Sequence, residues 1–217
     1  MTLSGNTQMM HWNQRRSRLP EGYREVDYLE STGAQWIDTL YVLQENDVIS
    51  TQYAFLSVSA SGDNNFAFGY QYYTSTEDSH IFSYISQQRV VRISYLSPSV
   101  IIPSYTVGDW INVTELRKEK VIVNGTTYAF TTNGIIQDIT CHIFADHYVA
   151  NNENKIRPSA CRFRQFDIVG KRSYIPCVRT ADGKPGMYDL CGSVCGLTGT
   201  PFYINAGAGV DFLWGEL

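Results

Sequence analysis

The stretch KVIVNGTTYAF, residues 120–130, predicts a β-hairpin. Asn124 and Gly125 stand between two arms rich in β-branched and aromatic residues, and an Asn-Gly pair favours a type I′ turn because both of its positions take positive φ. Similar short runs, such as HIFSYIS and CRFRQFDIV, continue in both directions along the chain. Turn-forming segments such as TVGDW and TADGKPG separate them. Roughly a dozen short strands at near-regular spacing, without helical periodicity, predict a β-sandwich or a β-barrel.

The composition is that of a globular β-domain. Of the 217 residues, 43% are apolar and 18% are charged, which are ordinary values for a folded domain with a core. The 15 tyrosines suit both a half-buried sheet surface and a surface that meets a partner. The formal net charge of −4 argues against broad nucleic-acid binding, which requires a basic footprint. We expect one β-domain over residues 21–217, preceded by a separate segment, residues 1–20.

Several protein classes lack support in the sequence. No run approaches the roughly 18 apolar residues that a membrane-spanning helix needs. No apolar stretch lies between Met1 and Arg15, so we expect no secretory signal and synthesis in a bacterial cytoplasm. The 5 cysteines, an odd number, are then expected to be reduced and mostly buried. Without a phosphate-binding loop or a dinucleotide-binding glycine pattern, no cofactor is expected.

Residues 1–20 are polar and end at Pro20. They contain Trp12 and, close together, Arg15, Arg16 and Arg18. One interpretation is a disordered leader or linker. The other is an arm that becomes ordered on a partner surface, with Trp12 as its aromatic anchor and the arginines as ionic contacts.

Two segments resemble a known family. Residues 19–39, LPEGYREVDYLESTGAQWIDT, are similar to the pattern LPxGYxxVxYIxSTGxQYIDT. The later segments YIPCVRTADGKPGMYD and FYINAGAG are similar to IPCxxxxGxxGLYD and FYxNAGxG. Together they resemble the concanavalin A-like, LamG-like jelly-roll domains that are common in gut bacteria and their phages. The resemblance implies an all-β, antiparallel two-sheet sandwich, and it implies carbohydrate binding or roles on virions and cell surfaces.

The chain departs from the family pattern near its C-terminal end. It carries LCGSVCGLTGTP, residues 190–201, where the family has a shorter turn, and it continues past Gly209 with VDFLWGEL. Phe212, Leu213 and Trp214 form an apolar tail. If this tail is exposed, it predicts an assembly contact.

Three carboxylates occur in the stretch EVDYLE, residues 25–30. Glu25, Asp27 and Glu30 resemble the E-x-D-x-x-E motif of concanavalin A-like glucanases, in which a nucleophile and a general acid lie about 5–5.5 Å apart. On one strand Glu25 and Asp27 would share a face and Glu30 would lie on the other. Those glucanases carry the motif in the middle of their chains, whereas here it lies on the first strand. We therefore expect solvated carboxylates and no catalytic site.

Signals for metal binding are weak. Asp63 and Asp146 each begin a loop rich in amides and are candidate calcium ligands, but calcium prefers several carboxylates. Turn chemistry explains the same residues without an ion, so no metal is expected. His142 and His147 are the two histidines that are placed to share a site, although ordinary surface or core histidines are the alternative.

The run FAFGYQYY, residues 66–73, is the densest aromatic candidate for sugar binding. In a regular strand the side chains on one side are those of Phe66, Phe68, Tyr70 and Tyr72. Such a row is either part of the core or a platform, and Gln71 and Tyr73 then point the other way. We take Tyr70, Gln71 and Tyr73 as glycan-binding candidates. Trp36 and Trp110 are expected in the core.

These observations predict a non-enzymatic structural component of a bacteriophage particle, namely a capsid decoration, head-fibre or tail-associated protein on the virion surface. Its lectin-like jelly-roll domain would bind host or mucus glycans. The expected partners are other virion proteins, contacted through the arm and the tail, and a trimer is the expected assembly; no nucleic acid or membrane is expected. The alternative is a bacterial carbohydrate-binding module or adhesin. A glycoside hydrolase ranks last.

Overall fold

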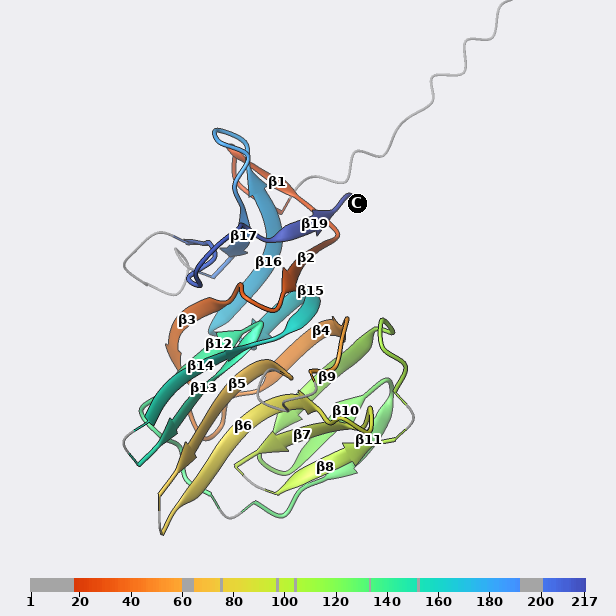
Figure 1. Ribbon diagram of the computed structural model, residues 1–217, viewed down its shortest axis with the longest axis vertical. Coiled ribbons are helices and arrows are strands. Elements are labelled where there is room, and N and C mark those ends of the chain that lie inside the picture. The colour runs from red at the N-terminus through yellow and green to blue at the C-terminus, as the bar shows by residue number, and fades with distance from the viewer. Residues whose placement is uncertain are drawn as a thin grey trace, which may run out of the picture.

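Figure 1 shows the computed structural model, in which two β-sheets pack face to face. The structure describes residues 18–59, 65–74, 76–96, 98–103, 105–132, 134–151, 153–191 and 201–217. These residues contain strands and turns but no helix. The fold is an all-β, antiparallel jelly-roll sandwich, which confirms the predicted fold class.

The larger sheet has eleven strands within the described residues. Its main path, in spatial order, is β11 (Thr126–Ala129), β10 (Lys120–Val123), β9 (Ile111–Arg117), β4 (Ile49–Phe55), β15 (Ala160–Ile168), β16 (Arg172–Arg179), β17 (Pro185–Asp189) and β18 (Phe202–Tyr203). The remaining strands are β1 (Tyr23–Glu25), which pairs with β16, and β2 (Tyr28–Thr32), which pairs with both β15 and β19 (Leu213–Gly215).

The smaller sheet has eight strands within the same residues. Its main path is β14 (Glu153–Pro158), β13 (Ala145–Ala150), β5 (Phe66–Tyr73), β6 (Asp78–Ile85), β7 (Val91–Tyr95) and β8 (Ser99–Ile102). The other two strands are β12 (Thr140–Ile143), which pairs with β5, and β3 (Ile37–Val42), which pairs with β12. Figure 1 shows β14, β13, β5 and β6 side by side in the front layer. β13 runs parallel to β5, whereas the other described strand pairs are antiparallel.

The hairpin predicted at residues 120–130 is confirmed. β10 and β11 pair antiparallel, with Val123 opposite Thr126. Asn124 and Gly125 connect them with φ values of 49° and 81°, as a type I′ turn requires. This turn is specified locally, because Asn and Gly are the residues that adopt positive φ at least cost.

The core fills the space between the two sheets and is rich in aromatic rings. Tyr53 of β4 stacks on Phe163 of β15, with ring centroids 5.4 Å apart, and meets Phe68 of β5 edge-on at 5.7 Å. The Tyr53 hydroxyl and the Ser83 hydroxyl of β6 lie 2.5 Å apart. A buried tyrosine needs such a partner for its hydroxyl group, and here the partner belongs to the facing sheet.

The two family-like motifs meet in space and join the ends of the domain. Asn205 accepts hydrogen bonds at Oδ1 from the backbone N–H groups of Trp36 and Gly207, at 3.2 and 2.8 Å. Its Nδ2 donates to the carbonyl of Val210 at 3.0 Å, and Gln35 Nε2 donates to the same carbonyl at 3.3 Å. A Cβ atom on Gly207 would lie 2.2 Å from the Ala34 carbonyl oxygen, which explains a glycine at this close approach.

The N-terminal strand region differs from the prediction. The stretch EVDYLE is not one strand, because β1 ends at Glu25 and β2 begins at Tyr28. Between them the Val26 N–H donates to the Pro176 carbonyl and the Asp27 N–H donates to the Gly215 carbonyl. At this point the N-terminal segment therefore stops pairing with β16 and begins to pair with β15 and β19.

Some predicted features lie outside the described residues, namely Trp12, Arg15, Arg16 and Asp63. Within the described part of the chain, no helix has the length and apolar character that crossing a membrane requires.

Candidate functional site

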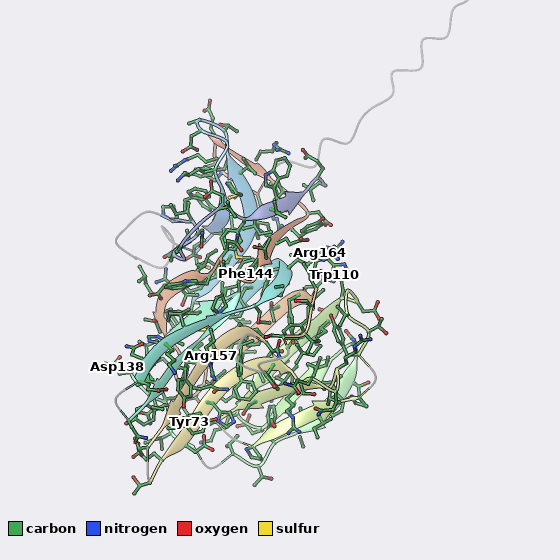
Figure 2. All side chains as sticks on the ribbon, viewed as in Figure 1. Tyr73, Trp110, Asp138, Phe144, Arg157 and Arg164 are labelled. Carbon is green, nitrogen blue, oxygen red and sulfur yellow. The ribbon has the colours of Figure 1, made fainter. Side chains whose placement is uncertain are left out.

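The outer face of the smaller sheet carries a group of aromatic side chains. Residues that lie directly opposite each other in a sheet point to the same face. Gln71 of β5 lies opposite His80 of β6 on one side and opposite Tyr148 of β13 on the other. We call the rings on this face the aromatic platform: Phe66, Tyr73, His80, Phe82, Tyr84 and Tyr148. Figure 2 labels Tyr73 and Arg157 at this sheet.

The rings of the aromatic platform form a continuous series of contacts. Tyr73 contacts Tyr148 and His80, with ring centroids 5.8 and 6.2 Å apart. His80 stacks on Phe82 at 4.7 Å, and Phe82 meets Phe66 edge-on at 5.5 Å. Phe66, Phe82 and His80 are buried, whereas Tyr73 and Tyr148 are half-buried. A ligand therefore reaches the platform at Tyr73 and Tyr148 and, beyond Phe66 and Phe82, at Tyr84, which is also half-buried.

Arg157 of β14 lies at the centre of this face. Its guanidinium carbon lies 4.4 Å from the Phe66 ring centroid and 4.2 Å from that of Tyr148. Its Nε and Nη2 donate to the two oxygens of Asp146, at 2.9 and 2.5 Å, and Nη2 also donates to Gln71 Oε1 at 2.5 Å. The charge of Arg157 is thus matched by a buried carboxylate, and the Gln71 amide is held in a fixed orientation.

Burial and neighbouring charges also determine the protonation states of the titratable side chains on this face. Burial lowers the pKa of His80, against the opposing effect of its 2.9 Å contact with Asp78, so the imidazole is neutral at neutral pH. Burial, with the negative charge of Asp78 acting in the same direction, raises the pKa of Tyr73 to about 12, so its hydroxyl remains protonated. Burial raises the pKa of Asp146 to about 6, although Arg157 acts in the opposite direction.

This combination of groups suits the recognition of a polar ring. The faces of Tyr73 and Tyr148 offer apolar area, and their hydroxyls donate and accept hydrogen bonds. The exposed Asp78 carboxylate adds a directional polar group beside the rings, whereas the Gln71 side chain is buried, with 5% of the residue exposed. A sugar, which alternates apolar C–H faces with hydroxyls, requires such a mixture.

Two expectations for β5 are wrong. Tyr70 lies in the core with none of its surface exposed, so no ligand contacts its ring on the surface. Phe66 lies on the outer face, because the register between β5 and β6 shifts between Phe66 and Phe68. Such a bulge reverses the direction in which the side chains alternate. Gly69 lies within this strand, where a Cβ atom would be 1.9 Å from the Ile81 carbonyl oxygen.

The structure does not support Asp146 as a calcium ligand. Both of its carboxylate oxygens accept hydrogen bonds from Arg157, and no surface of the residue is exposed. Among the described residues, no group of three or more His, Cys, Asp or Glu side chains is placed to hold a metal ion. The other candidate, Asp63, lies outside them.

The three carboxylates of EVDYLE are on the larger sheet and not on the aromatic platform. Glu25 forms an ion pair with Arg18, and Asp27 forms one with Arg164 at 2.8 Å. Glu30 lies opposite Arg162 of β15. The residues do not follow the alternation of a single strand, and two of the three carboxylates are engaged by arginines.

The docking candidates have different environments. Arg18 is held by Glu25, at the edge of the domain. Phe212 is wrong as a docking residue, because only 3% of it is exposed and its ring packs on Phe144 at 4.6 Å. Leu213 and Trp214 are 53% and 37% exposed on β19, so they remain candidates for a contact.

His142 and His147 come together, as their spacing allowed. Their rings stack in parallel with centroids 4.6 Å apart, and His142 also stacks on Trp36 at 4.6 Å. The nitrogen lone pairs of an imidazole lie in its ring plane, so those of two stacked rings lie in nearly parallel planes and do not converge on one metal ion. We call this group the histidine stack: Trp36, His142 and His147.

Sequence reasoning missed Arg157, Tyr148 and His80, which complete the face around Gln71 and Tyr73. The signal was available only in part: the alternation D-x-Y in β13 indicates a shared face for Asp146 and Tyr148. The parallel pairing of β13 with β5 links segments far apart in the chain, and no local pattern predicts it.

Comparisons with family models, curated proteins and solved structures gave no match to the chain. The fold and the outer face of the smaller sheet therefore define the class of protein: a jelly-roll sandwich with an aromatic platform around a buried ion pair.

Proposed function

We propose that the protein is a non-enzymatic, lectin-like domain that binds glycans with the outer face of its smaller sheet. The observation that carries this proposal is the contact between two half-buried tyrosines, Tyr73 and Tyr148, whose ring centroids lie 5.8 Å apart. Arg157 fixes the Gln71 amide, and the side chains of Tyr73 and Tyr148 flank it. Because this buried network holds the two rings in place, they lose little conformational entropy when they bind a ligand.

The face favours neutral sugars. The positive charge of Arg157 is matched by Asp146, and the exposed carboxylate of Asp78 repels an anionic ligand. Hydroxyl groups bind to amide, phenol and carboxylate groups through directional hydrogen bonds. The glycan we expect is therefore one whose recognised residue carries hydroxyls and no acid group.

A glycan array tests this proposal. We expect saturable binding of the full chain to neutral glycans, and we expect Tyr73→Ala and Tyr148→Ala each to weaken it by about tenfold or more. Tyr128→Ala is the matched control, because it removes a half-buried tyrosine from β11 of the other sheet. Absence of binding across a broad array, or equal binding by the tyrosine variants, would contradict the proposal.

We further propose that the domain is a structural component of a bacteriophage particle. The supporting observation is β19, whose exposed Leu213 and Trp214 lie on a strand that pairs with β2 on one side. Within the described residues nothing pairs with its other side, and an open strand edge with apolar side chains favours contact with another chain. The predicted arm, residues 1–20, supplies the other expected contact.

Light scattering after size exclusion tests this assembly role. We expect the full chain to form a defined oligomer and a chain that begins at Arg18 to be a folded monomer. The chain that begins at Arg18 keeps the ion pair with Glu25, so a change of fold is not the expected cause. Monomers in both cases, together with no stoichiometric recovery of the protein in purified particles, would contradict it.

A further inference from the structure

The outer face of the larger sheet carries a second group of aromatic and charged side chains. Arg164 of β15 places its guanidinium carbon 4.2 Å from the ring centroid of Trp110. Arg162, two positions earlier on the same strand and face, lies 5.1 Å from the Tyr28 ring and 5.4 Å from the Trp110 ring. Figure 2 shows Trp110 beside Arg164. Trp110 was expected in the core, but it is half-buried on this face.

The two arginines differ in how their charge is matched. Arg164 donates from Nη2 to Asp27 at 2.8 Å. Arg162 makes no ion pair and no hydrogen bond through its side chain within the described residues. Its Nε is buried without a partner, whereas its terminal nitrogens are not among the buried atoms. Arg162 therefore presents a guanidinium group that two aromatic rings hold in place. No carboxylate of the described residues pairs with it.

The acidic residue that lies opposite Arg162 in the sheet does not neutralise its charge. Glu30 lies directly opposite Arg162 on the neighbouring strand, yet its carboxylate forms no salt bridge with Arg162 in the part of the chain that the structure describes. Arg162 lies opposite Ala54 on its other side. Ala54 has a small apolar side chain and is fully buried, so it offers the Arg162 guanidinium group no polar partner.

Two amide side chains lie on the same face. Gln52 of β4 is two positions from Ala54, and it lies opposite Asn112 of β9. Asn112 is exposed and Gln52 is half-buried. Both side chains donate and accept hydrogen bonds, so they extend the face beside Arg162 with groups that match hydroxyls.

We propose that Arg162 is the centre of an anion-binding subsite that takes the carboxylate of an acidic sugar. A guanidinium fork binds a carboxylate through two parallel hydrogen bonds. The Gln52 and Asn112 amides bind the hydroxyls of the same or the next sugar residue. This site is separate from the aromatic platform and does not depend on glycan binding there.

An acidic sugar fits this face better than an acidic peptide does. A run of peptide carboxylates would bring several negative charges near Asp27 and Glu30, which repel them. A sugar acid carries one carboxylate among several hydroxyls, which suits one unmatched guanidinium group with the two amides of Gln52 and Asn112 on the same face. The local charges therefore select a single carboxylate with polar, uncharged neighbours.

Calorimetric titration of the full chain with acidic oligosaccharides tests the proposal. The probes are oligosaccharides that contain galacturonate, glucuronate or sialate, together with their methyl esters, which keep the sugar and remove the charge. We expect at least one acid to bind and its ester to bind about tenfold more weakly or not at all. Poly-glutamate serves as the peptide probe, and we expect it to bind more weakly than the acid that binds.

Three variants assign the binding to this face. Arg162→Gln should weaken binding of the acid by about tenfold or more, whereas Glu30→Gln should strengthen it because a competing negative charge is removed. Arg92→Gln is the control, since it removes an exposed arginine from β7 of the other sheet and should leave the affinity unchanged. Arg162→Lys keeps the charge without the fork and should lie between the wild type and Arg162→Gln.

If Arg162→Gln fails to fold, the tighter binding of the acid that we expect for Glu30→Gln still tests the proposal. The proposal is overturned if no acid in the panel binds, if acid and ester bind equally, or if Glu30→Gln leaves the affinity unchanged. It is also overturned if poly-glutamate binds as tightly as the sugar acid. None of these outcomes bears on neutral-glycan binding at Tyr73 and Tyr148, which is tested separately.

Discussion

At the scale of single residues, the ion pair between Asp146 and Arg157 determines the geometry of the aromatic platform. Asp146 is fully buried, and removing one member of such a pair leaves the other charge without compensation. We expect Asp146→Ala to lower the free energy of unfolding by about 3–5 kcal/mol, as measured by urea denaturation. The double variant Asp146→Ala/Arg157→Ala should lose less than the sum of the single variants, because no unpaired charge remains.

The control for this prediction is Asp182→Ala. Asp182 also pairs with an arginine, Arg179, at 2.6 Å, but both side chains are exposed to solvent. Exposed pairs contribute little to stability, so this variant should unfold close to the wild-type midpoint. Equal losses for the buried and the exposed aspartate would show that burial of the pair does not matter.

A second residue-scale prediction concerns pH and the histidine stack. Burial lowers the pKa of His147, and His142 beside it lowers it further. The unfolded chain then binds a proton at His147 more readily than the folded chain does. The contribution of His147 to the free energy of unfolding is therefore complete above about pH 6.5 and is lost as the pH falls below that value. Asp38 and Asn154, which face the stack, act in the opposite direction but do not reverse the shift.

The measurement is the difference in unfolding free energy between the wild type and His147→Gln from pH 7.5 to pH 5. We expect the wild type to lose stability relative to the variant as the pH falls. The comparison with the variant is necessary because Asp146, whose pKa is raised to about 6, contributes stability that is lost as the pH rises through that range. A difference that does not change with pH would contradict the prediction.

At the scale of elements, the contact between the two ends of the domain gives a third prediction. Asn205 accepts the N–H groups of Trp36 and Gly207, so Asn205→Ala leaves two donors without partners. We expect a loss of about 2 kcal/mol in the free energy of unfolding. Asn205→Asp keeps the accepting oxygen and should lose less. If both variants were as stable as the wild type, the segment around Asn205 would not hold the ends together.

The elements also indicate which parts of the fold the sequence predicts. The hairpin at Asn124 and Gly125 was predictable because its turn needs positive φ at two adjacent residues, which is a local requirement. The bulge after Phe66 was not predictable, since its register depends on the pairing of β5 with β6. The break between Glu25 and Tyr28 likewise depends on distant partners, namely β16 and β15.

The candidate site was predicted in part for the same reason. Alternation in FAFGYQYY placed Gln71 and Tyr73 together on the side opposite Tyr70, and this is correct. Arg157 arrives from a strand about 85 positions later in the chain, through the pairing of β14 with β13 and of β13 with β5. The apolar tail was ambiguous for a different reason, because a short apolar run such as Phe212 to Trp214 fits burial and exposure equally well.

At the scale of the whole molecule, the two proposed binding faces lie on opposite sides of the sandwich. The aromatic platform is on the outer face of the smaller sheet, and Arg162 is on the outer face of the larger sheet. Because the core separates them, we expect a neutral glycan and an acidic oligosaccharide to bind at the same time without changing each other's affinity. Calorimetric titration of one ligand in the presence of saturating amounts of the other measures this directly, and mutual exclusion would contradict the placement of the sites.

The measurement that tests the central claim most directly is a titration of the ¹⁵N-labelled full chain with a neutral glycan that binds on the array, followed by NMR. We predict saturable chemical-shift changes that are largest for amides of β5, β6 and β13, around Gln71, Tyr73, His80 and Tyr148. Tyr73→Ala should remove these changes at the same glycan concentration. Changes that are largest on β16 to β19, or no saturable change, would contradict glycan binding by the outer face of the smaller sheet.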